Sequence, residues 1–288
     1  MKTCISSYSF NKLLRSGEFT QLSLIEQVKD MGFDAIEFTN LNPPKGVSQA
    51  DYAAQIREES EKRGLPVANY TIGAELLNSP SLDEEVARLI GEVDTAAVLG
   101  AKGMRHDATG GYKGAERAYK TFDDALRTLV EGCRRVTEYA ADKGIKTMVE
   151  NHGFFCQDSE RMEKLVSGVG KENFGCLLDI GNFLCADEEP EKATGRLAPF
   201  VKHVHVKDFH VKSGRLPNPG MGFFTSRAGN YLRGAIIGHG DVPVTQCLSV
   251  LKKNGYGGYV SIEFEGMEDN LMAIGIGLEN LQRFIASL

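Results

Sequence analysis

Acidic and imidazole side chains stand at the ends of four short apolar segments in the second half of the chain: Glu150, Asp179, His205 and Glu263. Converging carboxylates repel one another, and burying them without a partner is strongly unfavourable, unless a cation lies among them. Three carboxylates and one imidazole form a hard, oxygen-rich ligand set, which suits Mn²⁺ or Mg²⁺. The pattern therefore predicts one divalent metal ion, with Mn²⁺ as the first expectation and Mg²⁺, Zn²⁺ or Co²⁺ as alternatives.

Each of these four residues also has an ordinary explanation when it is taken alone. Glu150 or Glu263 could form a salt bridge at a domain rim, and Asp179 could cap a helix. His205 could be an interior histidine that is held by hydrogen bonds. Because the four coincidences fall at four successive segment ends, we favour the metal site.

A second set of polar residues is expected to bind substrate. His106 and His152 end predicted strands, and Lys207 lies two residues beyond His205, on the same face of an alternating run. The alternatives are hydrogen-bonded rim histidines for the first two and a buried ion pair for Lys207. The complete set of substrate-binding candidates is His106, His152, Asn182, Lys207 and Arg233.

Eight short β-type segments must position these groups, and longer amphipathic segments alternate with them. The predicted strands cover residues 3–9, 35–39, 67–72, 103–107, 145–152, 175–180, 201–208 and 259–264. The main helical segments cover residues 23–31, 53–63, 82–99, 115–142, 159–166 and 244–253. Eight repeated βα units predict an α/β protein with a (β/α)₈ TIM barrel, in which catalytic groups lie at the carboxyl ends of the strands.

One interval between predicted strands is much longer than the others, and no linker-like composition divides the chain. We therefore expect a single domain over residues 1–288, with an insertion at 210–240 after the seventh strand. An irregular segment of this length is typically a lid or a binding loop, so we expect it to close over the barrel with Arg233 toward substrate. The aromatic and basic residues of this segment would equally serve a contact between subunits.

Composition excludes several classes of protein. Among 288 residues, 33 Lys and Arg stand against 39 Asp and Glu, which gives a net charge of −6 and disfavours nucleic acid or an anionic membrane as partner. We find no signal-peptide pattern and no apolar run of ~18 residues, so we expect a cytoplasmic protein. The six cysteines form no CxxC pair and are expected to be reduced thiols.

Four motifs carry a resemblance that spans the whole predicted barrel: Val149-Glu150-Asn151-His152, Leu178-Asp179-Ile180-Gly181-Asn182, Val204-His205-Val206-Lys207-Asp208, and the run from Gly255 to Glu263. With these motifs, the chain resembles the xylose isomerase-like TIM barrel superfamily, in its sugar phosphate isomerase/epimerase branch. That branch includes ketose 3-epimerases and inosose dehydratases.

The resemblance implies that Glu150, Asp179, His205 and Glu263 are metal ligands and that the two glutamates also move protons. It implies a small-molecule sugar substrate and a homo-oligomer, either a dimer or a tetramer. Asn182 departs from the pattern, because many relatives have histidine there. The departure argues against a multi-zinc endonuclease, while an amide can still hydrogen-bond a sugar hydroxyl.

The chemistry expected from this resemblance begins with removal of a proton next to a carbonyl, which gives an enediolate. Returning the proton from the other face epimerises the sugar, and returning it to the next carbon isomerises it. Loss of a β-hydroxyl would instead make the protein a dehydratase of a keto-inositol or a sugar derivative. A non-catalytic sugar-binding or scaffold subunit is the alternative from another class.

Overall fold

The structure is a computed structural model that describes residues 1–288. Eight parallel strands close into a barrel in the order β1-β11-β7-β6-β5-β4-β3-β2. They are β1 (Lys2–Ser6), β2 (Ala35–Thr39), β3 (Val67–Ile72), β4 (Gly103–His106), β5 (Lys146–Glu150), β6 (Phe174–Asp179), β7 (Val201–Val206) and β11 (Tyr259–Ile262). The predicted (β/α)₈ barrel is confirmed.

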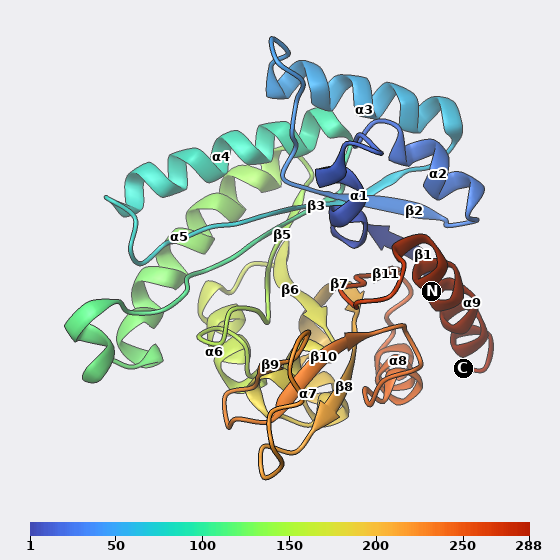
Figure 1. Ribbon diagram of the computed structural model, residues 1–288. Helices are drawn as coiled ribbons and strands as arrows, with labels where there is room; N and C mark the ends of the chain where they lie inside the picture. Colours follow the sequence, from blue (N-terminus) through green and yellow to red (C-terminus); the bar gives the residue numbers. More distant parts are fainter.

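Helices surround the barrel, and both chain termini lie on the same side of the molecule (Figure 1). The helices are α1 (Asn11–Ser16), α2 (Leu24–Asp30), α3 (Gln49–Arg63), α4 (Leu82–Leu99), α5 (Phe122–Asp142), α6 (Ser159–Val169), α7 (Pro190–Leu197), α8 (Val244–Lys253) and α9 (Asn270–Ala286). No helix combines the length and the apolar character needed to cross a membrane. All six cysteines are buried and unpaired.

Local capping explains where two of the helices begin. Ser48 accepts a hydrogen bond from the backbone of Asp51, so α3 begins at Gln49 rather than at the predicted residue 53. A reciprocal capping box between Thr121 and Asp124 begins α5. The predicted helix over 115–142 is therefore divided, with a short 3-10 turn before the main helix.

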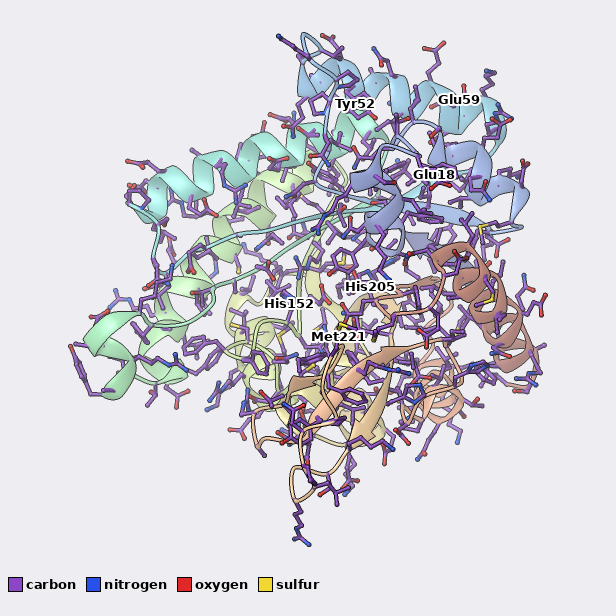
Figure 2. All side chains as sticks on the ribbon, viewed as in Figure 1. Glu18, Tyr52, Glu59, His152, His205 and Met221 are labelled. Carbon is purple, nitrogen blue, oxygen red and sulfur yellow. The ribbon has the colours of Figure 1, made fainter.

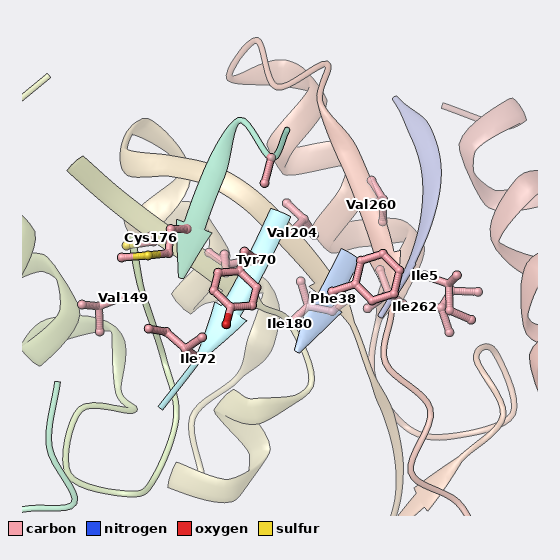
Figure 3. Close-up of a cluster of buried hydrophobic side chains, with 14 of the residues drawn as sticks. Ile5, Phe38, Tyr70, Ile72, Val149, Cys176, Ile180, Val204, Val260 and Ile262 are labelled. Carbon is pink, nitrogen blue, oxygen red and sulfur yellow. The ribbon is translucent and has the colours of Figure 1, made fainter. Parts of the chain in front are cut away.

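Alternation along the strands sorts side chains between two regions. Apolar residues on one face pack against the helices in the main core, as Figure 3 shows for Ile5, Phe38, Val149, Val204 and Ile262 among others. The other face carries buried polar residues into the barrel, including Glu37, Asn69, Arg105, Glu150, Asp179, His203, His205 and Ser261. A barrel interior lined by ionisable groups requires that they neutralise one another or a bound cation.

The long interval after the seventh barrel strand is not an irregular loop. It forms a three-stranded antiparallel sheet of β8 (Asp208–Lys212), β9 (Phe224–Thr225) and β10 (Tyr231–Ala235). The seventh predicted strand, 201–208, is accordingly divided between β7 and β8. In Figure 1 the small sheet lies at the opposite end of the view from α3 and α4.

A single carboxylate joins the two ends of this insertion. Asp208 begins β8, and its side chain accepts hydrogen bonds from the backbone N–H groups of Gly238, Gly240 and Val242 at 2.8, 2.9 and 3.1 Å. Gly240 is required there, because a Cβ would lie 2.2 Å from the Asp208 carboxylate. The insertion therefore leaves and re-enters the barrel at one point.

Candidate active site

Four strand ends bring Glu150, Asp179, His205 and Glu263 together in the barrel. One ligand atom from each lies within 4.8 Å of those of the other three, and all four residues are buried. His205 Nδ1 is 3.8 Å from Glu150 Oε1, 4.0 Å from Asp179 Oδ2 and 3.7 Å from Glu263 Oε2. Since β5, β6, β7 and β11 are neighbours in the sheet, their ends deliver the four side chains to one place.

Two atoms of this cluster test whether a cation fits it. Asp179 Oδ2 and His205 Nδ1 are buried without a hydrogen-bond partner, although buried polar atoms are normally paired. Carboxylate oxygens and an imidazole nitrogen are also the donor atoms that divalent ions take from proteins. The cluster therefore fits a divalent metal ion, and these side chains could hold it.

Glu37 in β2 fixes the orientation of the His205 ring. Its Oε1 lies 2.6 Å from His205 Nε2, and its Oε2 lies 2.8 Å from His203 Nε2. Burial alone would raise the pKa of Glu37, but the two histidines lower it to about 2. An ionised carboxylate can only accept, so Nε2 of His205 carries the proton and Nδ1 faces the three carboxylates.

Lys207 places a cation beside the same carboxylates. Its Nζ is 2.7 Å from Glu263 Oε2 and 3.4 Å from Asp179 Oδ2. Burial would raise the pKa of Glu263, but Lys207 and His205 hold it well below its ordinary value. For Asp179, burial together with Glu150 and Glu263 outweighs Lys207 and raises the pKa to about 6. The two acids therefore differ in proton affinity.

Arg105 is a site residue that the sequence analysis missed. Its guanidinium lies 2.7 Å from Glu150 Oε2 and donates to Asp107 Oδ1 at 2.8 Å and to the carbonyl of Ile72 at 2.9 Å. Although burial opposes its charge, Glu150 and Asp107 keep the pKa of Arg105 above its ordinary value. Alternation along β4 allows either Arg105 or its neighbour His106 to enter the barrel, and the sequence analysis chose His106.

Two asparagines and a glycine hold the carboxylates in place. The Asn151 amide donates to the Asp179 carbonyl and accepts from the Asp179 N–H, both at 2.8 Å. Asn182 donates to Glu150 Oε1 at 3.0 Å and accepts from Lys207 at 3.3 Å. A Cβ on Gly181 would lie 2.6 Å from the Lys207 carbonyl oxygen, so this approach of β6 to β7 requires glycine.

The remaining substrate-binding candidates are placed in three different ways. His152 lines the cavity and lies 3.1 Å from Asp107. His106 is fully buried on the other face of β4, where it contacts the Asp107 carbonyl, so it does not reach the cavity. Arg233 in β10 packs over Phe223 and lies 3.5 Å from Glu268, also outside the cavity. We therefore leave His106 and Arg233 out of the proposed site.

The insertion does not close over the cavity as expected. None of the residues that line the cavity comes from it. Arg227 instead contacts Asp158, and both Ser226 and Asn230 hydrogen-bond Asp187, beyond β6. These contacts hold the insertion against the loops after β5 and β6, at the side of the barrel.

A cavity of about 790 Å³ opens above the cluster. Arg105, Glu150, Lys207, Glu263 and Glu265 lie at its inner end. The rest of its wall comes from His152, from the ends of β2 and β3, and from the segments that follow β1, β2 and β3. Lys207 Nζ is 3.6 Å from Glu265 Oε1. A small polar molecule in this cavity could therefore reach both glutamates.

The fold and these motifs define a class of protein, and comparison with known proteins agrees. A family profile described as "Xylose isomerase-like TIM barrel" matches residues 25–284. The chain belongs to this family.

Its relatives include enzymes that act on sugars and related compounds. An inosose dehydratase of Clostridium botulinum (strain Alaska E43 / Type E3) is 25% identical over 251 residues, which are 84% of this chain and 80% of that protein. A 3-keto-D-glucoside 4-epimerase from E. coli matches with a TM-score of 0.72 at 16% identity, over 98% of this chain and 99% of that one. A xylose isomerase-like TIM barrel protein from Mycobacterium smegmatis, in complex with magnesium, matches with a TM-score of 0.74 at 16% identity, over 99% of this chain and 97% of that one.

Proposed function

We propose that this protein is a divalent-metal-dependent epimerase or isomerase of a small keto sugar or sugar derivative. The observation that carries the proposal is the pair Glu150 and Glu263, which flank the unpartnered atoms of Asp179 and His205 at the inner end of an open cavity. Glu150, Asp179, His205 and Glu263 would hold the metal ion. When bound, the ion would supply positive charge that stabilises the enediolate form of the substrate.

In this proposal the two glutamates divide the proton transfers. One carboxylate takes the proton from the carbon next to the carbonyl, and the other returns a proton to the opposite face or to the adjoining carbon. Each glutamate has a cation beside it, since Arg105 lies 2.7 Å from Glu150 and Lys207 lies 2.7 Å from Glu263. His152 and Lys207 face the cavity and are proposed to bind substrate hydroxyls.

A second candidate is dehydration of a keto-inositol or a sugar derivative. Lys207 favours it, since a buried ammonium next to Glu263 can give a proton to a departing hydroxyl. The carbon-bound proton would pass to a glutamate, the C–O bond would break, and water would leave with the proton from Lys207. The inosose dehydratase relatives support the same reaction.

Proton exchange in D₂O tests the proposal. We would incubate the Mn²⁺-loaded protein with free ketoses and keto-inositols and follow them by NMR. Epimerisation or isomerisation gives a new sugar that carries solvent deuterium, whereas dehydration gives an unsaturated ketone. A protein that binds these compounds but exchanges no proton is a binding subunit, and that result would refute both catalytic proposals.

The identity of the metal and the assembly belong to the same proposal. We propose Mn²⁺ as the resident ion, ahead of Mg²⁺, Zn²⁺ and Co²⁺, on the chemistry of the donor set. Elemental analysis of the purified protein identifies the ion directly. We also propose a cytoplasmic homo-oligomer, a dimer or a tetramer, and light scattering measures its mass.

A further inference from the structure

The cavity is larger than a single sugar requires. A keto hexose has about 12 heavy atoms, and at the ~30 Å³ that one water occupies in the liquid it would fill roughly 360 Å³. The cavity measures about 790 Å³, so more than half of it would remain beyond one ring bound at the carboxylates. This remainder, which we call the distal arm, lies toward α1 and the segment after β2.

The distal arm is a built surface rather than a gap between mobile loops. Gln21 is 3% exposed, and its amide donates to the Asn40 carbonyl at 3.0 Å and accepts from the Asn42 N–H at 2.8 Å. Lys12 in α1 donates to the Gly266 carbonyl at 2.9 Å. These bonds tie α1 and the segment after β2 to the barrel, so the arm is formed before any ligand arrives.

Neutral groups and aromatic rings dominate the wall of the distal arm. Asn11, Thr20, Asn40 and Asn42 line it with amides and a hydroxyl, which both donate and accept hydrogen bonds, as sugar hydroxyls require. The aromatic rings are those of Tyr8, Phe19 and Tyr52, and aromatic faces pack on the C–H faces of sugars.

Charge argues against a phosphate or carboxylate in the distal arm. Arg15 is its one cation, and this side chain is exposed to solvent. The other cations of the cavity are Arg105 and Lys207, which already contact Glu150 and Glu263 at 2.7 Å. An anionic group would therefore meet no buried, free cation there.

We infer that the distal arm binds an uncharged second sugar unit, so that the substrate is a keto sugar carried on a glycoside rather than a free ketose or a sugar phosphate. The inference rests on the proposed function, because the reacting ring must lie at Glu150 and Glu263. It adds the substrate class: the reacting ring occupies the inner end, and a glycosidic bond leads outward past Tyr8. No residue of the insertion lines the cavity, so the arm and the insertion are separate surfaces; in the view of Figure 2, Tyr52 of α3 lies above His205 and Met221 of the insertion below it.

Calorimetry with unreactive sugars tests this inference without relying on turnover. Cellobiose and maltose carry two neutral rings, methyl glucoside carries one, and glucose 6-phosphate carries one ring and an anion. We expect the Mn²⁺-loaded protein to bind at least one disaccharide tenfold or more tightly than methyl glucoside. Glucose 6-phosphate should bind no better than methyl glucoside.

Substitutions in the distal arm test whether its residues cause the tighter binding of disaccharides. Asn40→Ala and Asn11→Ala remove side chains for which no hydrogen bond is found, so the fold should be retained. Each should reduce disaccharide affinity at least fivefold and leave methyl glucoside affinity within twofold. Asn218 is an exposed asparagine of the insertion that does not line the cavity. Asn218→Ala is the control, and it should change neither affinity although it removes a local hydrogen bond from the Gly220 N–H.

Two results would overturn the distal sugar site. One is equal affinity for disaccharides and methyl glucoside. The other is tightest binding of glucose 6-phosphate with loss of that binding in Arg15→Ala, which would assign the arm to an anion. If disaccharides bind as expected but keto sugars exchange no deuterium, the distal site stands and the proposed function fails. If free ketoses react and disaccharides gain nothing, the proposed function stands and the distal site fails.

Discussion

Glu37 Oε1 lies 2.6 Å from His205 Nε2, although the two residues are 168 positions apart in the chain. They belong to β2 and β7, which are separated in the barrel by β1 and β11. The contact therefore crosses the interior and exists only when the barrel is closed. It couples the orientation of a candidate ligand to completion of the fold.

Glu37→Gln should weaken metal binding while the barrel stays folded. An amide can also donate, so the Nε2 proton of His205 and the direction of Nδ1 are no longer fixed. Changes of this kind reduce metal affinity by roughly 10- to 100-fold. Titration with Mn²⁺ against a competing chelator measures the loss. His203→Asn leaves the contact of Glu37 with His205 intact and should change affinity less than threefold; an equal loss in both variants would contradict the orienting role.

Glu150→Gln and Glu263→Gln should separate proton transfer from folding. Each keeps an oxygen but loses the base, so turnover should fall by roughly 10² to 10⁴. Circular dichroism should show an unchanged fold, and Glu172→Gln at an exposed site should keep full activity. A variant that retains more than about a tenth of the turnover would show that its glutamate is not an essential acid or base.

Metal addition should stabilise the folded protein. At a free Mn²⁺ concentration of about 100 times the Kd, binding contributes roughly 2.7 kcal/mol, which should raise Tm by about 5 °C or more for a chain of this size. Asp179→Asn should remove most of this increase, because it neutralises a buried carboxylate whose Oδ2 makes no hydrogen bond and has only Lys207, at 3.4 Å, beside it. Differential scanning fluorimetry with and without EDTA makes the comparison. An undiminished increase in the variant would place the ion elsewhere.

Arg233→Ala should leave substrate kinetics nearly unchanged. The side chain packs over Phe223 and lies near Glu268, outside the cavity, so no substrate contact is lost. We expect KM within twofold of the unmodified protein. Light scattering on the same variant reports whether the insertion contributes to assembly. A KM increase of tenfold would mean that the insertion does reach the substrate.

Glu75→Gln should destabilise the protein at neutral pH but not in acid. Burial would raise the pKa of Glu75, but hydrogen bonds from Thr109 and the Gly110 N–H hold it below its ordinary value. The carboxylate thus adds stability above the unfolded pKa of about 4.3, which is lost as pH falls through the folded pKa.

Urea denaturation of the unmodified protein and of Glu75→Gln should show free energies of unfolding that differ by roughly 1 to 2 kcal/mol at pH 7, the usual contribution of hydrogen bonds to a charged group. The difference should shrink toward zero at about pH 3, where both proteins carry a neutral group at this position. A difference that is constant with pH would assign the effect to side-chain shape instead of charge.

Most of the barrel could be predicted because the residues within and next to each helix or strand determine it. Residues 35–39, 67–72, 82–99 and 244–253 are predicted to the residue, since apolar periodicity and flanking turn residues mark both ends. The four clustered side chains could be predicted for the same reason, because the end of a parallel strand places its residues without knowledge of distant contacts.

Two kinds of feature could not be predicted: which of two adjacent strand residues faces the barrel interior, and which residues far apart in the chain contact each other. His106 and Arg105 are adjacent, and only the register of β4 decides which enters the barrel, since successive side chains point to opposite faces. Glu37 acquires its importance from two histidines on a strand three positions away around the barrel. The sheet of the insertion arises from long-range antiparallel pairing between Lys212 and Tyr231, within a stretch rich in glycine and proline.

The junction at Asp208 has a consequence for how this protein can diversify. One carboxylate holds both the exit and the return of the chain, so the segment between them can lengthen, shorten or be exchanged while β7 and β11 keep their register. The sequence of the insertion can therefore vary without a change in the strands on either side of it. The rim of this barrel therefore provides a position at which a new recognition surface can be grafted with its chemistry left in place.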